Sequence, residues 1–230
     1  MNVKVIGLGG IGNCLVTHLC RFLNFNQTDA VVTFIDGDVF TKDNHPRQAF
    51  HRFGNKAEIT KEWMEEMFPS LCFRAEPEYV ANLTNEHVTL DNLSRLVYNG
   101  DIVFLCVDNH VSRKMVSDYG ENLSDITVFS GGNELTYGNV QIFIRKEGVN
   151  VTLPLANKFH PEIANPKDMH PLAAGCMQML PRMPQLVFTN NMAAAIMLNA
   201  FYAHLQGAVM ADEIYFDVIT GSCRPVTRSK

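Results

Sequence analysis

The sequence predicts an α/β fold: a Rossmann-like, mostly parallel sheet with helices on both faces, followed by antiparallel C-terminal strands. Two observations carry this prediction. Up to residue 130, short β-rich runs alternate with segments of helical periodicity, which is the pattern of parallel sheets. Beyond Gly138, residues 139–145 instead alternate with period two, as an antiparallel strand does.

In the first half of the chain, the pattern of apolar residues predicts two strands and two helices in order. Continuous apolar runs over 2–7 and 30–36 are typical of strands buried on both faces. Between them, apolar residues recur at helical spacing over 10–25. A polar loop follows residue 36, and a helix over 54–68 should end before Pro69.

The second half predicts further alternation and then a change of pattern. We expect a weak strand over 72–75, a helix over 85–98, the clearest strand over 101–107, a helix over 109–119 and a strand over 126–130. Residues 150–184 form a long, irregular and proline-rich segment, which in a compact domain is usually either functional or disordered. A nearly all-apolar helix over 186–205 should be buried in this subunit or against a partner. Residues 214–220 and 223–226 should form a closing hairpin.

Composition excludes several classes of protein. The 47% hydrophobic and 19% charged residues are ordinary for a globular chain, and the net charge of −5 argues against a nucleic-acid partner. No apolar run approaches the roughly 20 residues that cross a bilayer, so we expect no membrane partner. The absence of a secretory signal, and six cysteines without a C-x-x-C pair, favour the cytoplasm and predict no structural zinc.

A glycine-rich turn between the first strand and the first helix predicts a nucleotide site. Gly7, Gly9 and Gly12, with Gly10 between them, form G-x-G-x-x-G. Glycine lets the backbone approach a phosphate, and the helix N-terminus offers free N–H groups. Asp36, at the end of the second strand, is where an acid commonly accepts ribose hydroxyls. These residues alone would favour an NAD-dependent dehydrogenase, and a tight packing turn is the alternative without a ligand.

The loop after Asp36 argues against NAD. It carries Asp38, Asn44, Arg47 and Gln48, and Lys56 follows near the start of the next helix. A guanidinium, an amide and an ammonium group suit a triphosphate, which a nicotinamide site does not need. Each residue alone could be a solvated loop residue, but together they favour a nucleoside triphosphate.

With these motifs the chain resembles the ThiF/MoeB/HesA superfamily, which shares its fold with ubiquitin-activating enzymes. The resemblance covers nearly the whole chain. The matching elements are G-L-G-G-I-G (7–12), D-x-D (36–38), N-x-x-R-Q (44–48), G-x-K-A (54–57), C-V-D-N (106–109) with Arg113, and S-G-G (130–132). The motif set is specific, although the glycine motif alone is weak.

The resemblance implies an adenylating enzyme. The C-terminal carboxylate of a ubiquitin-like or sulfur-carrier protein ending in glycine would attack the α-phosphate of ATP. Asp36 would hold the ribose, and Asn44, Arg47 and Lys56 would contact the triphosphate. Asp108, followed by Asn109, would hold Mg²⁺, and its alternative role is a helix N-cap. Neutralising charge matters most when an anion attacks an anion.

The proline-rich segment carries the other predicted catalytic residue. In the ubiquitin-activating branch a cysteine in the segment that crosses the active site accepts the acyl group as a thioester. Cys176 stands in such a segment, ahead of Pro181 and Arg182, and a thiolate is a good nucleophile toward an acyl-adenylate. An inert loop cysteine is the alternative. His160 and His170 in the same segment are expected to be surface residues, not a metal site.

The resemblance also sets the expected organisation. We expect one adenylation domain over 1–230, with a nucleotide-binding core (1–146), a crossover segment (147–185) and a C-terminal helix and strands (186–230). The chain begins at its first strand, so the arginine that relatives donate to a partner's ATP must come from elsewhere. A homodimer or heterodimer and a conjugating enzyme are implied partners. A sulfur-carrier adenylyltransferase without a thioester, and a non-catalytic subunit of an activating heterodimer, remain alternatives.

Overall fold

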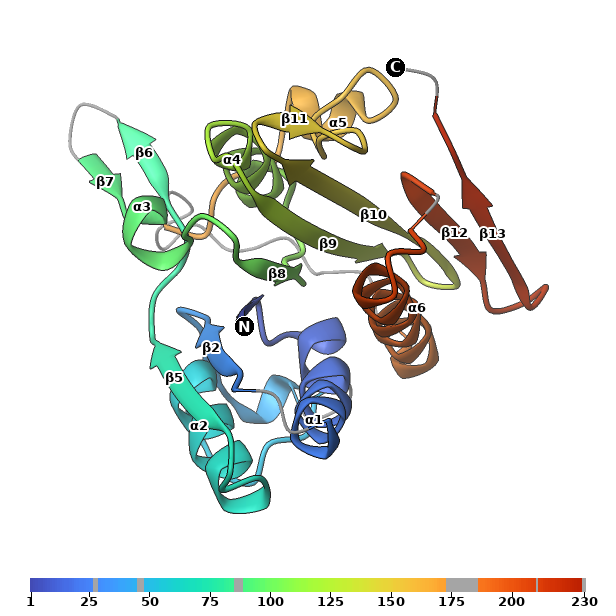
Figure 1. Cartoon of the computed structure of the whole chain (residues 1–230). Helices are drawn as coiled ribbons and strands as arrows, with labels where there is room; N and C mark the ends of the chain where they lie inside the picture. The colour runs from blue at the N-terminus through green and yellow to red at the C-terminus, as the bar shows by residue number, and fades with distance from the viewer. Residues whose placement is uncertain (27–28, 45–47, 85–88, 173–185, 210, 229–230) are drawn as a thin grey trace.

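The computed structural model describes the chain except for residues 27–28, 45–47, 85–88, 173–185, 210 and 229–230. Within the described residues, the main sheet has nine strands, eight of them in the order β13-β12-β10-β9-β8-β1-β2-β5 (Figure 1). The parallel strands are β1 (Asn2–Ile6), β2 (Val31–Ile35), β5 (Cys72–Glu76), β8 (Ile102–Leu105) and β9 (Ile126–Asn133). The antiparallel strands are β10 (Tyr137–Lys146), β11 (Val149–Asn150), β12 (Glu213–Asp217) and β13 (Ser222–Val226). The predicted fold class is confirmed.

Helices cover both faces of this sheet. One core lies under α1 (Gly10–Phe25), α2 (Lys56–Met67) and α6 (Val187–Leu205). The other core lies under α3 (Leu93–Leu96), α4 (His110–Gly120) and α5 (Pro161–Ala164). Along β1, Val3 and Val5 enter the first core and Ile6 the second, because successive strand side chains point to opposite faces. This arrangement explains why the strands are continuous apolar runs.

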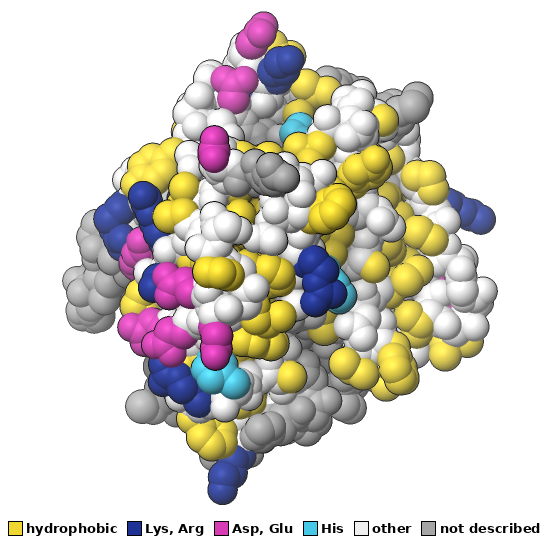
Figure 2. Space-filling view, turned by 60° about the horizontal axis from the view of Figure 1, so that its bottom comes forward, with side chains coloured by type: hydrophobic (Ala, Val, Ile, Leu, Met, Phe, Trp, Pro, Cys, Tyr) yellow, Lys and Arg dark blue, Asp and Glu magenta, His cyan; other side chains and the backbone are white. Residues whose placement is uncertain are grey.

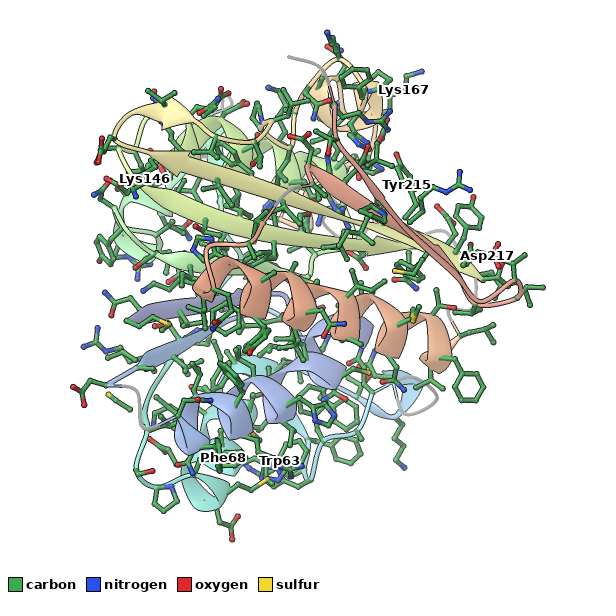
Figure 3. All side chains as sticks on the ribbon, turned by 45° about the vertical axis from the view of Figure 1, so that its right-hand side comes forward. Trp63, Phe68, Lys146, Lys167, Tyr215 and Asp217 are labelled. Atoms are coloured by element: carbon green, nitrogen blue, oxygen red, sulfur yellow. The ribbon has the colours of Figure 1, made fainter. Side chains whose placement is uncertain are left out.

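The C-terminal helix α6 is packed on one side and exposed on the other. Figure 3 shows it lying beside α1 along one face of the sheet, and Phe201 packs against the rings of Phe104 and Phe129. Phe188 and Tyr202 of α6 are exposed.

On the surface of the molecule, hydrophobic side chains are spread over the right half of Figure 2, and charged ones gather on its left. None of the described helices has the length and hydropathy needed to cross a bilayer.

The helix expected over 85–98 is wrong. The structure has β6 (Asn82–Thr84) paired with β7 (Thr89–Asp91), and the four-residue α3 follows. Threonine favours strands, and the Asn92 side chain fastens the base of this hairpin by accepting the Ala81 amide at 2.8 Å. Two further short strands, β3 (Val39–Phe40) and β4 (Gly54–Asn55), and the 3-10 helix η1 (Lys42–Asn44) occupy the polar loop after β2.

Candidate functional site: a cavity at the carboxyl edge of the parallel strands

The carboxyl ends of the parallel strands open into a cavity of about 1140 Å³. This volume is slightly above the range of about 300–1,000 Å³ that is usual for small-molecule sites, and the edge is where open α/β sheets bind ligands. Most residues predicted from the sequence line it: Gly7, Gly9, Gly10, Asp36, Asp38, Asn44, Gln48, Lys56, Asp108 and Asn109. The structure therefore brings together residues that are up to a hundred positions apart in the sequence.

The glycines of the first turn have separate roles. Gly7 has φ +88°, a conformation that favours glycine. A Cβ on Gly12 would lie 2.1 Å from the Gly7 carbonyl oxygen, so Gly12 is needed for close packing and does not line the cavity. Gly9, the N-cap of α1, has no side-chain cap, and a Cβ there would meet nothing nearer than Gln48 at 3.9 Å. The amides at the start of α1 thus border open space, as an anion site requires.

The C-terminal helix α6 packs closely against Gly10. A Cβ on Gly10 would lie 2.3 Å from the Asn190 side-chain nitrogen, so glycine is needed where α6 meets the start of α1. Asn190 is fully buried, and its amide has no hydrogen-bond partner among the described residues. The predicted phosphate-binding turn is therefore supported by a residue 180 positions away.

Asp36 is a buried carboxyl with two backbone donors. Its oxygens accept the amides of Leu8 at 2.5 Å and Asp38 at 2.8 Å. Burial raises the pKa of Asp36 to about 6; nearby Lys56 opposes this rise and Asp38 reinforces it. The amides fix the carboxyl at the cavity wall and leave lone pairs for further donors such as hydroxyl groups.

Lys56 places a buried cation at the same wall. The residue is 4% exposed, and its ammonium donates to Asp38 Oδ2 at 2.9 Å. Asp38 also accepts the hydroxyl of Tyr79. Asn55 caps α2 by accepting the Ala57 amide at 2.9 Å and donates to the Asp36 carbonyl oxygen at 2.9 Å. The start of α2 is thereby fastened to the end of β2, which fixes Lys56 beside Asp36.

Other predicted ligands are partly engaged within the protein. The oxygen of Asn44 accepts the Thr41 amide at 3.0 Å, and Asn109 caps α4 by accepting the Ser112 amide at 2.8 Å. The N-cap is therefore Asn109 and not Asp108, for which the sequence left this role open. Gln48 is buried, and its side-chain oxygen has no partner within the described part of the chain. Arg47 lies outside the described residues.

Asp108 and Arg113 occupy the far side of the glycine turn. Asp108 is exposed on the cavity. The buried Arg113 guanidinium donates to the carbonyl oxygens of Val107 at 2.9 Å and Gly131 at 2.7 Å. A Cβ on Gly132 would lie 2.8 Å from this guanidinium, which explains a glycine of the S-G-G motif. Burial lowers the pKa of Arg113, and Asp108 opposes that effect.

The described part of the crossover segment is anchored beside the cavity. Asp168 accepts the amides of His110 at 2.5 Å and Val111 at 3.2 Å, at the N-terminus of α4. His170 Nε2 donates to the Val80 carbonyl oxygen at 2.7 Å. Pro171 then lines the cavity. The predicted nucleophile Cys176, like Arg182, lies outside the described residues.

The expectation that His160 and His170 are surface residues is wrong. They are 6% and 2% exposed. His160 lies between Glu162 Oε1 at 2.8 Å and Glu213 Oε2 at 2.7 Å. The contact with Glu213 joins residues 53 positions apart in the chain, so no local signal could have indicated it. The cavity-lining Tyr79 was missed for the same reason.

No cluster of three or more metal-ligating side chains exists among the residues that the structure describes. This does not conflict with a nucleotide-bound Mg²⁺, which usually takes one or two carboxylates and completes its shell with phosphates and water. Asp108 presents one exposed carboxylate at the cavity. The donor set fits a metal that arrives with its nucleotide.

Comparisons with known proteins agree with this fold. Two curated relatives, the adenylyltransferase and sulfurtransferase uba4 proteins of Aspergillus terreus and Aspergillus niger, are 27% and 26% identical over 120 residues. The match covers 50% of this chain but 22% of each relative. Among solved structures, E. coli MccB with ATP has a TM-score of 0.70 at 15% identity, covering 98% of this chain and 63% of that one. PaaA has a TM-score of 0.66 at 15% identity, covering 97% and 71%. The ThiF family matches residues 1–214, and the chain belongs to that family.

Proposed function

We propose that this chain binds ATP in the cavity and adenylates the C-terminal carboxylate of a ubiquitin-like or sulfur-carrier protein. The observation that carries the proposal is the buried Lys56 ammonium beside Asp36, in the cavity that the open glycine turn also lines. A redox dinucleotide has no need of a buried cation there, whereas a triphosphate does. The names of the uba4 relatives, and the structure of MccB with ATP, support the choice of reaction.

In the proposed reaction, a carboxylate oxygen of the acyl substrate attacks the α-phosphorus, and the bond to the leaving pyrophosphate breaks. Asp36 accepts ribose hydroxyls, and the α1 amides and Lys56 face the phosphates. Arg47 and Asn44 would contact the phosphates together with these groups. Mg²⁺, held at Asp108, would neutralise charge on the phosphates. The chain's own contribution is positioning and fixed charge.

We further propose that Cys176 takes the acyl group from the adenylate as a thioester. The thiolate would attack the acyl carbon and AMP would leave. Pro171 is the last described residue before Cys176 that lines the cavity, and its position supports this proposal. A reaction that stops at the adenylate fits the family equally well, and so does an acyl partner other than a ubiquitin-like protein, such as the MccA that is named together with MccB.

The test is titration calorimetry followed by a single-turnover assay. Wild type should bind Mg²⁺–ATP but not NAD, and Asp108→Asn should lose the Mg²⁺-dependent part of the affinity. With a small protein ending in glycine, wild type should release pyrophosphate and form an adenylate. Cys176→Ser should keep the adenylate and lose a thiol-sensitive adduct. Binding of NAD in place of ATP would contradict the proposal, and ATP binding without any adenylate would favour the non-catalytic subunit.

A further inference from the structure

One wall of the cavity has no role in the proposed reaction. It is formed by Glu78, Tyr79 and Val80, which follow β5 at the outer end of the parallel strands. The Glu78 side chain is 29% exposed, so it is open to a ligand. Nearby, Val80, Val107 and Pro171 supply apolar surface.

The order of the strands places a nucleotide base at this wall. Along the edge, Asp108 follows β8, the glycine turn follows β1, Asp36 follows β2 and Glu78 follows β5, in the spatial order β8-β1-β2-β5. If phosphates lie at the glycine turn and the ribose at Asp36, an extended nucleotide reaches β5 with its base. This step rests on the proposed function.

The Glu78 carboxyl is held in one orientation. Its Oε2 accepts the Asn92 amide at 2.7 Å, and its Oε1 accepts Arg95. Asn92 is itself 3% exposed and fixed, since it accepts the Ala81 amide and donates to the Tyr79 carbonyl oxygen. Each carboxyl oxygen keeps a second lone pair. The wall therefore presents rigid acceptors to a ligand that carries a donor.

We infer that Glu78 is a specificity-determining residue that selects adenine by accepting a hydrogen bond from its exocyclic amine. An oxo-purine such as guanine or hypoxanthine has a carbonyl oxygen at that position. Two acceptors facing each other across a partly desolvated wall disfavour binding, so the same group rejects the wrong base.

The test compares binding of ATP and ITP, which differ in the group at C6 and in the hydrogen on N1, by titration calorimetry. Wild type should prefer ATP by roughly tenfold to a hundredfold, as expected for a hydrogen bond to a charged group. Glu78→Ala should bring the ATP:ITP ratio close to one. Glu78→Gln, which can turn an N–H donor toward the base, should bind ITP better than wild type does.

Glu76→Ala is the matched control. Glu76 bonds the same Arg95 at 3.3 Å but is not among the residues that line the cavity, so its loss should leave the ratio unchanged. Equal affinity of wild type for ATP and ITP, or an unchanged ratio in Glu78→Ala, would overturn the inference while leaving adenylation intact. Failure of wild type to bind ATP at all would overturn the proposed function and this inference with it.

Discussion

The carboxyl edge of β1, β2 and β8 and the antiparallel end of the sheet hold their charged groups in different ways. At the carboxyl edge, Asp36 is buried with backbone donors, and its pKa is raised to about 6, so its charge costs stability at neutral pH. Lys56, which lies beside Asp36, is also buried. The side chain of Asp38, the ion-pair partner of Lys56, is 42% exposed.

At the antiparallel end the charges compensate one another. Burial alone would lower the pKa of His160, but hydrogen bonds to Glu213 and Glu162 outweigh it and raise the pKa. Burial opposes ionisation of Glu213, yet bonds from His160 and Arg228 lower its pKa. Arg228 donates to Glu213 at 2.6 Å and lies over the Phe159 ring.

The comparison separates two uses of buried charge. At the antiparallel end, His160, Glu162, Glu213 and Arg228 pair their charges with one another. These contacts hold the segment around α5 to the C-terminal strands. The carboxyl edge holds charges that the protein alone does not fully compensate, which is expected where a ligand supplies the missing partner. His160 and Glu162 also line the cavity, so variants at the two ends should differ in how strongly they affect stability relative to binding.

The largest effect is expected for Lys56→Met. Removing the ammonium takes away a fixed cation facing the phosphates, so affinity for ATP and the rate of pyrophosphate release should fall by about a hundredfold or more. Lys61→Met, which breaks an exposed ion pair with Glu65 on the same helix, is the control and should change neither. Binding of ATP by Lys56→Met within twofold of wild type would remove the basis for a triphosphate site.

Asp36→Asn should stabilise the protein while it weakens nucleotide binding. The folded pKa of about 6 exceeds the ordinary 3.8, so the folded state loses stability as pH rises from about 4 to 6. That loss is about 3 kcal/mol. Asn has a single accepting oxygen, so it cannot accept both the Leu8 and the Asp38 amides, and the amide left without an acceptor offsets most of the gain. We therefore expect a net gain of about 1 kcal/mol at pH 8.

Urea unfolding at pH 5 and pH 8 measures this gain, with the exposed Asp118→Asn as control. Lower stability of Asp36→Asn than wild type at pH 8 would show that the buried charge does not destabilise the fold. Unchanged ATP affinity would remove Asp36 from the ribose site.

The smallest effect is expected for His160→Gln, and it should depend on pH in a defined direction. The folded pKa of His160 is raised above 6.5, so its contribution is complete below pH 6.5 and is lost as pH rises through the folded pKa. We expect His160→Gln to cost about 1 kcal/mol at pH 6 and less at pH 9. The exposed His18→Gln is the control in the same unfolding series. A cost that grows with pH would mean that the imidazole is held neutral.

The sequence predicts the carboxyl edge far better than the antiparallel end. The glycine turn, Asp36, Lys56 and Asp108 each follow a strand or begin a helix, and the fold brings such positions to one edge. His160 and Glu213 are 53 positions apart and are joined only by folding. The helix expected over 85–98 was wrong because Asn92 and the hairpin contacts override a weak local period. Tyr79 and Glu78 carry no motif, since their roles depend on Asp38, Asn92 and Arg95.

The contact between Asn190 and Gly10 limits how the chain can be divided. The first 146 residues hold the turn that should cradle phosphates, yet the apolar face of α1 and the side of Gly10 are covered by α6. A fragment cut after β10 would expose that face and leave the turn unsupported. We therefore do not expect residues 1–146 to behave as a transplantable module, because α6 packs against the glycine turn and the helix that follows it.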